Sequence, residues 1–208
     1  LPFVTAPNKF EALAAHDAMV FMSGALATIA GSAYKIANDI RFLGAGPRAG
    51  LAELILPHDG LTSSIMPGKR NPTLAEALLQ VCYRVMGNHV TVTHAGAAGH
   101  FELNVAKPVL IHNLLHSIEV LTDCVSLFTH KLLSGLELNR PQLARIVEHS
   151  LLSASVLNPL LGYDRGAQTT RKAADEGLSP KEAAVQLWLI IAAEYDQRVR
   201  PESMISPG

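Results

Sequence analysis

The sequence predicts an all-α protein in which a bundle of long helices is followed by a small helical C-terminal domain. Three observations support this prediction. Apolar residues between 111 and 132 alternate steps of three and four over three heptads, as in the seam of a long packed helix. An uncharged stretch at 18–34 is rich in small residues, and the helix signals beyond 139 mark shorter elements. We therefore expect a bundle domain at 1–139 and a small domain at 140–208.

The first predicted helix begins after Asn8 and continues to about Leu43. Asn8 is a favourable N-cap residue, and Glu11 stands at the capping-box position. Small side chains in the middle of this helix allow a neighbouring helix to approach closely. The uncharged stretch is close to the roughly 18–20 residues that a bilayer span requires. Its Gly, Ala, Ser and Thr content favours instead the inner helix of a bundle.

Two irregular segments separate the predicted long helices. Gly, Pro, Asp and Ser dominate 44–73, where we expect a loop with a short apolar stretch. The second helix begins near Pro72 and is predicted to bend or pause at 86–88, and 96–104 forms another break. The third helix, predicted over 107–134, is roughly 40 Å long at 1.5 Å per residue. Other helices must cover its apolar seam, which consists of Ile111, Leu114, Ile118, Leu121, Val125, Phe128 and Leu132.

Shorter helices are predicted in the C-terminal domain. Their limits follow from residues that start and stop helices. Gly177 is predicted to end one helix in the left-handed conformation, and Ser179 with Pro180 to begin the next. The remaining elements are expected as a helix at 139–153, a turn at 158–159 and a helix at 165–176.

Charge and cysteine content exclude several classes of function. The 17 basic and 18 acidic residues give a formal net charge of -1, so no positive field would hold a nucleic acid or an anionic membrane. Cys82 and Cys124 lie in apolar helical patterns without paired spacing, and we expect free thiols that pack in the interior. The chain opens on Leu1 rather than Met, and we expect it to be part of a larger protein.

The segment 62–73, reading TSSIMPGKRNPT, is the part of the sequence most suited to chemistry. Paired serines, a Pro-Gly pair, a lysine and an asparagine stand just ahead of a helix. In one interpretation this is an exposed loop of solvated polar residues. In the other, Lys69 and Asn71 hold a carboxylate while a serine hydroxyl exchanges a proton. A serine base needs N–H donors and a cation to stabilise its alkoxide. The residues alone leave both interpretations open.

The motif SSIMPGK followed by NP resembles the signature loop of the fumarase/aspartase superfamily. The resemblance extends along the chain through VTAPNKFEALAAHDA, KIANDIRFL, GPRAGLAE, VMGN, FELNV and VRPE. Several of these motifs are similar to those of class II fumarases, and Glu102 in FELNV stands where aspartases carry Gln. Thr62 replaces the usual Gly before the serines, and Arg70 replaces a small apolar residue. The resemblance therefore favours a class II fumarase over other members of the superfamily.

By this resemblance, Ser63 and Glu76 are the catalytic residues. Ser63 matches the general base that takes the C3 proton of malate, and Glu76 matches the carboxylate that partners a histidine supplied from elsewhere. The lysine and the asparagine of the loop would stabilise the aci-carboxylate intermediate. No metal or organic cofactor is implied. The implied substrate-binding residues are Ser64, Lys69, Arg70 and Asn71.

The resemblance implies reversible hydration of fumarate to malate by a homotetramer in the cytoplasm or, in a eukaryote, the mitochondrial matrix. The family builds each site from three signature regions on different subunits, and the two upstream regions have no counterpart in this chain. We therefore expect the chain to be inactive without an N-terminal region. Within the superfamily, aspartate ammonia-lyase or a related lyase is the alternative. A non-catalytic helical assembly fragment is the alternative outside it.

Three other features of the sequence are assigned structural roles. His112 and His116 lie four apart on a helix, but no third ligand stands nearby in the sequence. His16 and Asp17 are expected to form a satisfied polar pair on a long buried helix. The segment 44–50, reading GAGPRAG, follows a helix and lacks the spacing of a phosphate-binding loop.

Overall fold

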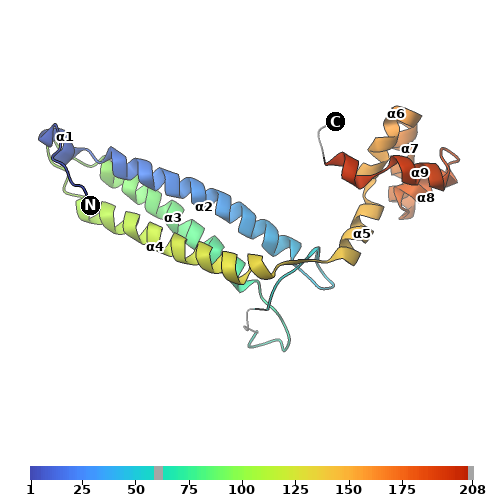
Figure 1. The fold of residues 1–208 in the computed structure, drawn as a ribbon, viewed down its shortest axis with the longest axis horizontal. Coiled ribbons are helices and arrows are strands. Elements are labelled where there is room, and N and C mark those ends of the chain that lie inside the picture. Colours follow the sequence, from blue (N-terminus) through green and yellow to red (C-terminus); the bar gives the residue numbers. More distant parts are fainter. Residues whose placement is uncertain (59–62, 206–208) are drawn as a thin grey trace. The chain divides into compact units, whose positions relative to one another are not determined.

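The computed structural model describes residues 1–58 and 63–205, which form two compact units, Leu1–Leu138 and Asn139–Gly208. Helices dominate both units (Figure 1), which confirms the predicted all-α fold. In the described residues, regular strand structure is limited to β1 (Leu54–Ile55) and β2 (Glu137–Leu138). These short strands pair antiparallel, with Leu54 opposite Leu138. The pairing ties the apolar stretch of the 44–73 loop to the segment that follows the third long helix.

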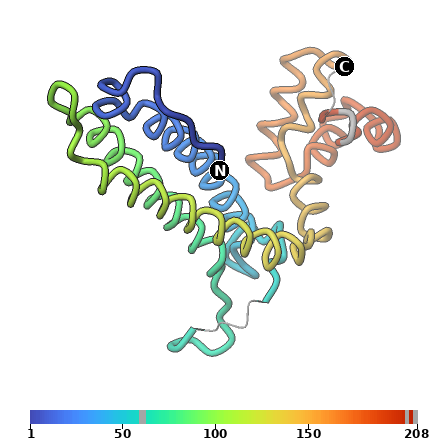
Figure 2. The backbone as a smooth tube through the Cα atoms, turned by 60° about the vertical axis from the view of Figure 1, so that its left-hand side comes forward, coloured from blue at the N-terminus to red at the C-terminus, as the bar shows by residue number. Residues whose placement is uncertain are grey.

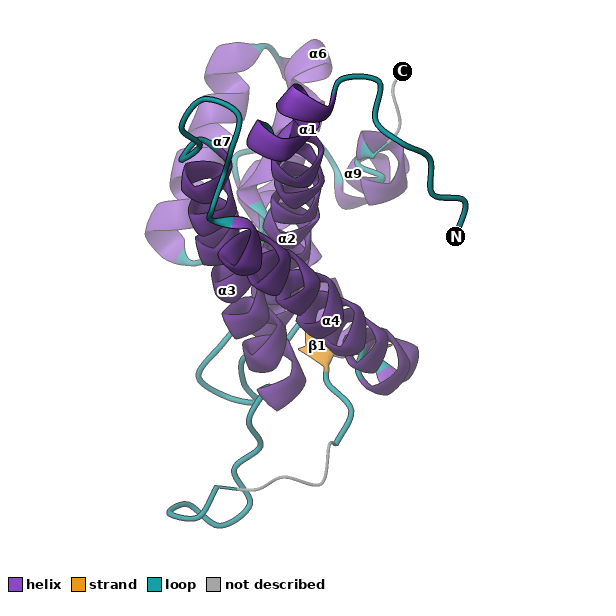
Figure 3. Ribbon diagram, turned by 90° about the vertical axis from the view of Figure 1, so that its left-hand side faces the viewer, coloured by secondary structure: helices purple, strands orange, loops and turns teal. Residues whose placement is uncertain are grey.

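Three long helices form the first unit. They are α2 (Asp17–Leu43), α3 (Thr73–Gly96) and α4 (Lys107–Lys131), and they lie side by side with α3 packed against both others (Figures 1 and 3). The predicted seam of α4 faces this core. Its buried members are Leu114, Leu121, Phe128 and Leu132. Ile111 is exposed, and Leu110 is the fully buried residue at that end of α4.

Small buried side chains allow α2 and α3 to pack closely. Ala30, Ala37, Ala75 and Cys82 are all fully enclosed between the helices. Burial, helped by the neighbouring Cys124, raises the pKa of the Cys82 thiol to about 11. Both cysteines are free. Cys82 is fully buried, whereas Cys124 is half-buried against the same core, so interior packing is confirmed for Cys82 and only in part for Cys124. Among the described helices, α2 is long and apolar enough to cross a membrane, a property that the core helix of a bundle shares.

The prediction of one continuous helix from Asn8 to about Leu43 is wrong. The chain forms α1 (Lys9–Ala14), capped as predicted by the Asn8 side chain, then becomes extended at Ala15 before α2 begins. The carbonyl of Leu13 explains the break. It accepts hydrogen bonds from the Lys107 Nζ atom at 2.6 Å and from the Asn104 backbone N–H at 3.2 Å. These long-range donors occupy the acceptor that a continuous helix would use.

Of the predicted bend or pause at 86–88, the pause is wrong, because α3 is continuous through Gly87. Asn88 is almost fully buried and faces α4, where its side-chain amide donates to the Ser117 hydroxyl at 2.9 Å and to the Asn113 carbonyl at 3.4 Å. The Asn88 side chain therefore contributes to helix packing instead of ending the helix. The predicted irregular segment beyond Gly96 is confirmed.

Short helices make up the second unit. The bounds are α5 (Arg140–His149), η2 (Leu151–Leu157), α6 (Asn158–Leu161), α7 (Tyr163–Glu176), α8 (Pro180–Gln186), α9 (Ala192–Arg198) and η3 (Pro201–Met204), and η1 (Leu133–Gly135) precedes β2 in the first unit. The predicted stop at Gly177 is confirmed by its left-handed φ of 66°. The predicted Ser179 cap is confirmed as a full capping box with Glu182. Leu157, Ala184, Ile190 and Tyr195 form the core of this unit.

Candidate functional site

The described residues 63–71, which lead into α3, project beyond the end of the three-helix bundle (Figure 2). Two local turns organise the described part that leads into α3. In the first, the Lys69 N–H donates to the Met66 carbonyl at 3.2 Å. Pro67 presets its own φ for this turn, and Gly68 has φ +77°, so the four residues have the features of a type II β-turn. The predicted Pro-Gly pair therefore reverses the chain and brings Lys69 back toward Ser63.

The hydroxyl of Ser63 is the acceptor of the second turn. Its Oγ accepts the backbone N–H of Met66 at 3.1 Å and that of Ile65 at 3.3 Å. The Ser63 N–H in turn donates to the Lys69 carbonyl at 3.4 Å, which closes the segment into one compact loop. Two N–H donors on one hydroxyl oxygen stabilise negative charge on that oxygen. A serine base needs both N–H donors and a nearby cation, and this arrangement supplies the N–H donors.

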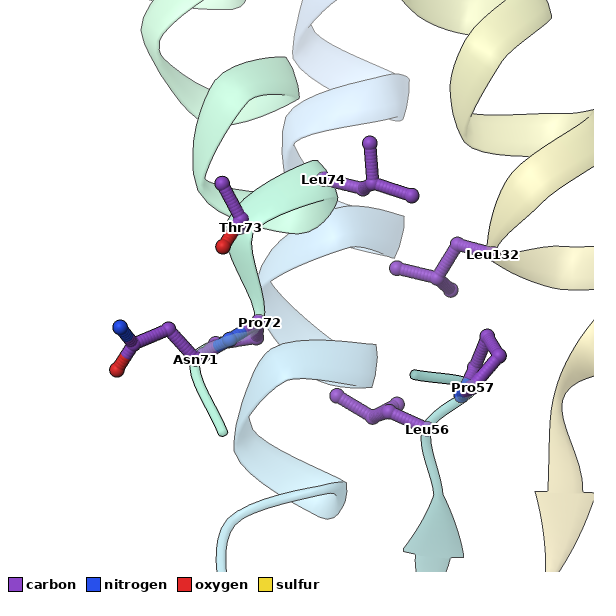
Figure 4. A pocket seen from close by; sticks show the side chains of 7 residues that line it. All are labelled: Leu56, Pro57, Asn71, Pro72, Thr73, Leu74 and Leu132. Carbon is purple, nitrogen blue, oxygen red and sulfur yellow. The ribbon is translucent and has the colours of Figure 1, made fainter. Parts of the chain in front are cut away.

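The other predicted substrate-binding residues surround this loop at different depths. Ser64, Lys69 and Arg70 are exposed, whereas Asn71 is half-buried at the start of α3. Asn71 lies at the edge of a small apolar hollow, and Figure 4 shows its amide pointing away from the leucines on the opposite side. Thr62 lies outside the described residues. The lining of the hollow is Leu56, Pro57, Asn71, Pro72, Thr73, Leu74 and Leu132.

Glu76 lies in the first turn of α3, separate from the Ser63–Lys69 turn. A carboxylate is favoured there by the helix dipole. Its Oε1 atom forms an ion pair with the Nε atom of Arg41 on α2 at 3.4 Å. Among the predicted site residues that the structure describes, one set of contacts joins Ser63 to Lys69, and a separate ion pair joins Glu76 to Arg41. The histidine that the resemblance assigns to Glu76 remains a prediction.

Comparison with known proteins assigns this architecture to a family. The family described as Lyase matches residues 1–87, and the family described as Fumarase C C-terminus matches residues 154–206. Fumarate hydratase 1, mitochondrial, of Arabidopsis thaliana is 56% identical over 208 residues, covering 100% of this chain and 42% of that protein. This chain belongs to the class II fumarase family. It spans less than half the length of the curated relatives that it matches.

Two further class II fumarases support this assignment. Fumarate hydratase class II of Rickettsia conorii is 56% identical over 205 residues, covering 99% of this chain and 44% of that protein. The crystal structure of the class II fumarase from Schistosoma mansoni superposes with a TM-score of 0.91 at 42% identity, covering 97% of this chain and 42% of that one. The helical arrangement and the sequence therefore lead to the same family.

Three other sequence predictions concern positions outside the Ser63–Lys69 turn. His112 and His116 stack their rings with centroids 6.1 Å apart, and the described residues contain no group of three or more potential metal ligands. The predicted satisfied pair at His16 is wrong. His16 lies at the break before α2, and its buried Nε2 atom has no hydrogen-bond partner among the residues that the structure describes. The segment 44–50 belongs to a turn in which the Ala52 N–H donates to the Ala45 carbonyl.

Arg41 is the residue beside the site that sequence reasoning missed. The signal available was a basic residue in the last turn of a predicted helix, which the helix dipole favours. That signal indicates a cation at a helix end and does not indicate its partner. The partner follows from the antiparallel packing of α2 and α3, which places the end of one helix beside the start of the other (Figure 1).

Proposed function

We propose that this chain forms part of a fumarate hydratase, which interconverts fumarate and malate, and that it contributes the serine base to each active site. One observation carries the proposal. The Ser63 hydroxyl accepts two backbone N–H groups within a turn that also brings Lys69 back toward Ser63. Family membership and the names of the relatives support the substrate assignment.

In the proposed reaction, the Ser63 alkoxide removes a proton from C3 of malate. The electron pair of the broken C–H bond moves into the adjacent carboxylate, which becomes a dianionic aci form. Lys69 and Asn71 stabilise that charge through an ammonium group and an amide donor. The C2–O bond then breaks, its hydroxyl leaves as water after receiving a proton from an acid, and the C2=C3 double bond of fumarate forms. Glu76 partners the histidine that the rest of the enzyme supplies.

The exposed apolar surface of the bundle supports a homo-oligomeric enzyme, which we propose to be the tetramer of this family. Phe21 on α2 is 82% exposed. Ile29, Ile36 and Val90 also expose large apolar side chains along α2 and α3. Burial of such surface contributes roughly 25 cal/mol per Å2, so a second bundle packed against it stabilises the assembly. We further propose a location in the cytoplasm or the mitochondrial matrix.

A chimaera tests the proposed function. This chain would replace the corresponding segment of the Rickettsia conorii relative, so that upstream regions from a related fumarate hydratase complete each site. We expect the chimaera to form fumarate from malate, followed at 240 nm, and to act weakly or not at all on aspartate. The chain alone is expected to be inactive. Turnover of aspartate in preference to malate would support an ammonia-lyase, and an inactive but folded chimaera would support a structural fragment.

Three variants of this chimaera test the division of labour in the loop. Ser63→Ala is expected to lower kcat by roughly 10²-fold or more with KM little changed, as for loss of a general base. Lys69→Ala is expected to lower kcat/KM further, because it removes a charge that binds the intermediate more tightly than the substrate. Ser64→Ala is expected to be milder than either, because a backbone N–H at that position survives the substitution. Near-normal turnover by Ser63→Ala, with a crippled Ser64→Ala, would refute the assignment.

A further inference from the structure

The Arg41–Glu76 ion pair lies where the C-terminus of α2 meets the N-terminus of α3, and both helix dipoles stabilise it. Arg41 is in the last turn of α2, where a cation is stabilised by the helix dipole. Glu76 is in the first turn of α3, where an anion is stabilised in the same way. Because the two helices pack antiparallel, these ends are adjacent, and the Nε and Oε1 atoms are 3.4 Å apart.

Stability does not explain this contact. The Arg41 side chain is 46% exposed and the Glu76 side chain 39% exposed, so water screens the pair. Exposed pairs of this kind add little to the free energy of unfolding. The core of the bundle lies elsewhere, in the leucines and alanines between the three helices. The contact joins a carboxylate of the proposed site to a cation on the neighbouring helix.

A pair of tyrosines also links α2 to α3. Tyr83 and Tyr34 join their hydroxyls at 3.2 Å, and their ring centroids are 5.4 Å apart. The hydrogen bond with Tyr34 raises the pKa of Tyr83, and the charge of Arg41 opposes that increase. The α2–α3 interface therefore includes two side-chain contacts, Arg41–Glu76 and Tyr34–Tyr83.

We infer that Arg41 is a positioning residue that orients the Glu76 carboxylate toward the histidine brought by another part of the enzyme. A carboxylate has about four acceptor positions, so Glu76 can accept from Arg41 and from an incoming imidazole N–H together. Arg41 fixes the rotamer from one side and leaves the rest of the carboxylate directed into the assembled site. This inference rests on the proposed function, because only the complete enzyme contains the histidine.

Arg41→Gln in the parent chimaera is the first test. We expect kcat to fall by roughly tenfold with KM changed less than twofold, less than the 10²-fold that a full 1 Å misplacement of a catalytic group costs. Arg41→Lys retains a cation at the same helix end and is expected to recover most of kcat. Lys35→Gln is the matched control, because it removes another exposed cation of α2, one paired with Asp39. The control is expected to keep kcat within about twofold.

A double-mutant cycle separates positioning from a structural role. If Arg41 acts through Glu76, Arg41→Gln is expected to change kcat by less than about twofold in a Glu76→Gln background. An equal loss of kcat in both backgrounds, or parent-level kcat in Arg41→Gln alone, would overturn the inference while leaving the proposed function intact. A lower urea midpoint for Arg41→Gln that Arg41→Lys does not restore would also overturn it. An inactive parent chimaera would instead overturn the proposed function itself.

Discussion

The Ser63–Lys69 turn and the α2–α3 helix pair that supports it are organised by opposite means. Backbone and hydroxyl hydrogen bonds within seven residues shape the turn, whose side chains are mostly exposed. Burial of Ala30, Leu78 and Cys82 holds the helix pair together. The difference predicts that substitutions in the turn change activity without changing stability, whereas substitutions in the helix pair change stability first.

The largest expected effect is on the helix pair. Leu78 is 2% exposed in the core between the helices. Leu78→Ala in the chimaera is expected to reduce the free energy of unfolding by about 2–5 kcal/mol, from lost burial and the cavity left behind. Urea unfolding followed by circular dichroism measures the change. Gln80→Ala, on the exposed side of α3, is the control and is expected to change stability little. Equal effects of the two substitutions would contradict the packing role of Leu78.

Two glycines with open space around them provide the next comparison. Gly68 requires its positive φ, and an alanine there costs roughly 1–2 kcal/mol of local strain. We expect the exposed turn to relieve this strain by shifting, so that Gly68→Ala leaves the urea midpoint unchanged and lowers kcat of the chimaera by about tenfold. Gly87 is exposed and lies in the middle of α3. Gly87→Ala is expected to raise the free energy of unfolding by about 0.8–1 kcal/mol with unchanged kcat. If both variants changed the same property, the contrast between turn and helix would fail.

The Ser179 capping box is a local hydrogen-bonded feature at the start of a helix that packs in the core of its unit. Its removal is therefore expected to affect stability. The Ser179 hydroxyl accepts the Glu182 N–H at 3.2 Å, and α8 buries Ala183 and Ala184. Ser179→Ala is expected to lower the free energy of unfolding by about 1 kcal/mol, as is typical of lost N-caps. Thermal unfolding measures the change, with Ser155→Ala as an exposed serine control.

The same capping box has an expected pH dependence. The Ser179 backbone N–H, and then its hydroxyl, lower the pKa of Glu182 below its ordinary value. A group with a lowered pKa in the folded state stabilises the protein above its unfolded pKa and loses that contribution as the pH falls through the folded value. The difference in Tm between the parent and Ser179→Ala is therefore expected to be full at neutral pH and to shrink in acid. A difference independent of pH would rule out a contribution from the Glu182 carboxylate.

The smallest expected effect concerns Arg70. The side chain is exposed beside the turn, at a position where the resemblance expects a small apolar residue. If Arg70 only faces solvent, Arg70→Val leaves kcat and KM of the chimaera within about twofold, an energy below roughly 0.5 kcal/mol. A large rise in KM with kcat retained would show that Arg70 binds the substrate, as the resemblance would also allow. Steady-state kinetics with malate distinguish the two results.

Local sequence determined the features that residues a few positions apart can build. The Asn8 and Ser179 caps, the Gly177 stop and the Pro67–Gly68 turn depend on contacts between residues at most five apart, and the structure contains each of them. The all-α class followed similarly from the periodic apolar seam of α4. These features can be read from sequence because their energies depend mainly on side-chain type and spacing.

Tertiary structure decided the features in which distant groups compete for the same partner. The break at Ala15 arises because Lys107 and Asn104 take the Leu13 carbonyl, and α3 continues through Gly87 while the Asn88 amide bonds to α4. The partner of Glu76 likewise depended on which helix lay beside it. Periodicity and caps describe one element at a time, whereas these hydrogen bonds and ion pairs exist only after the helices have packed.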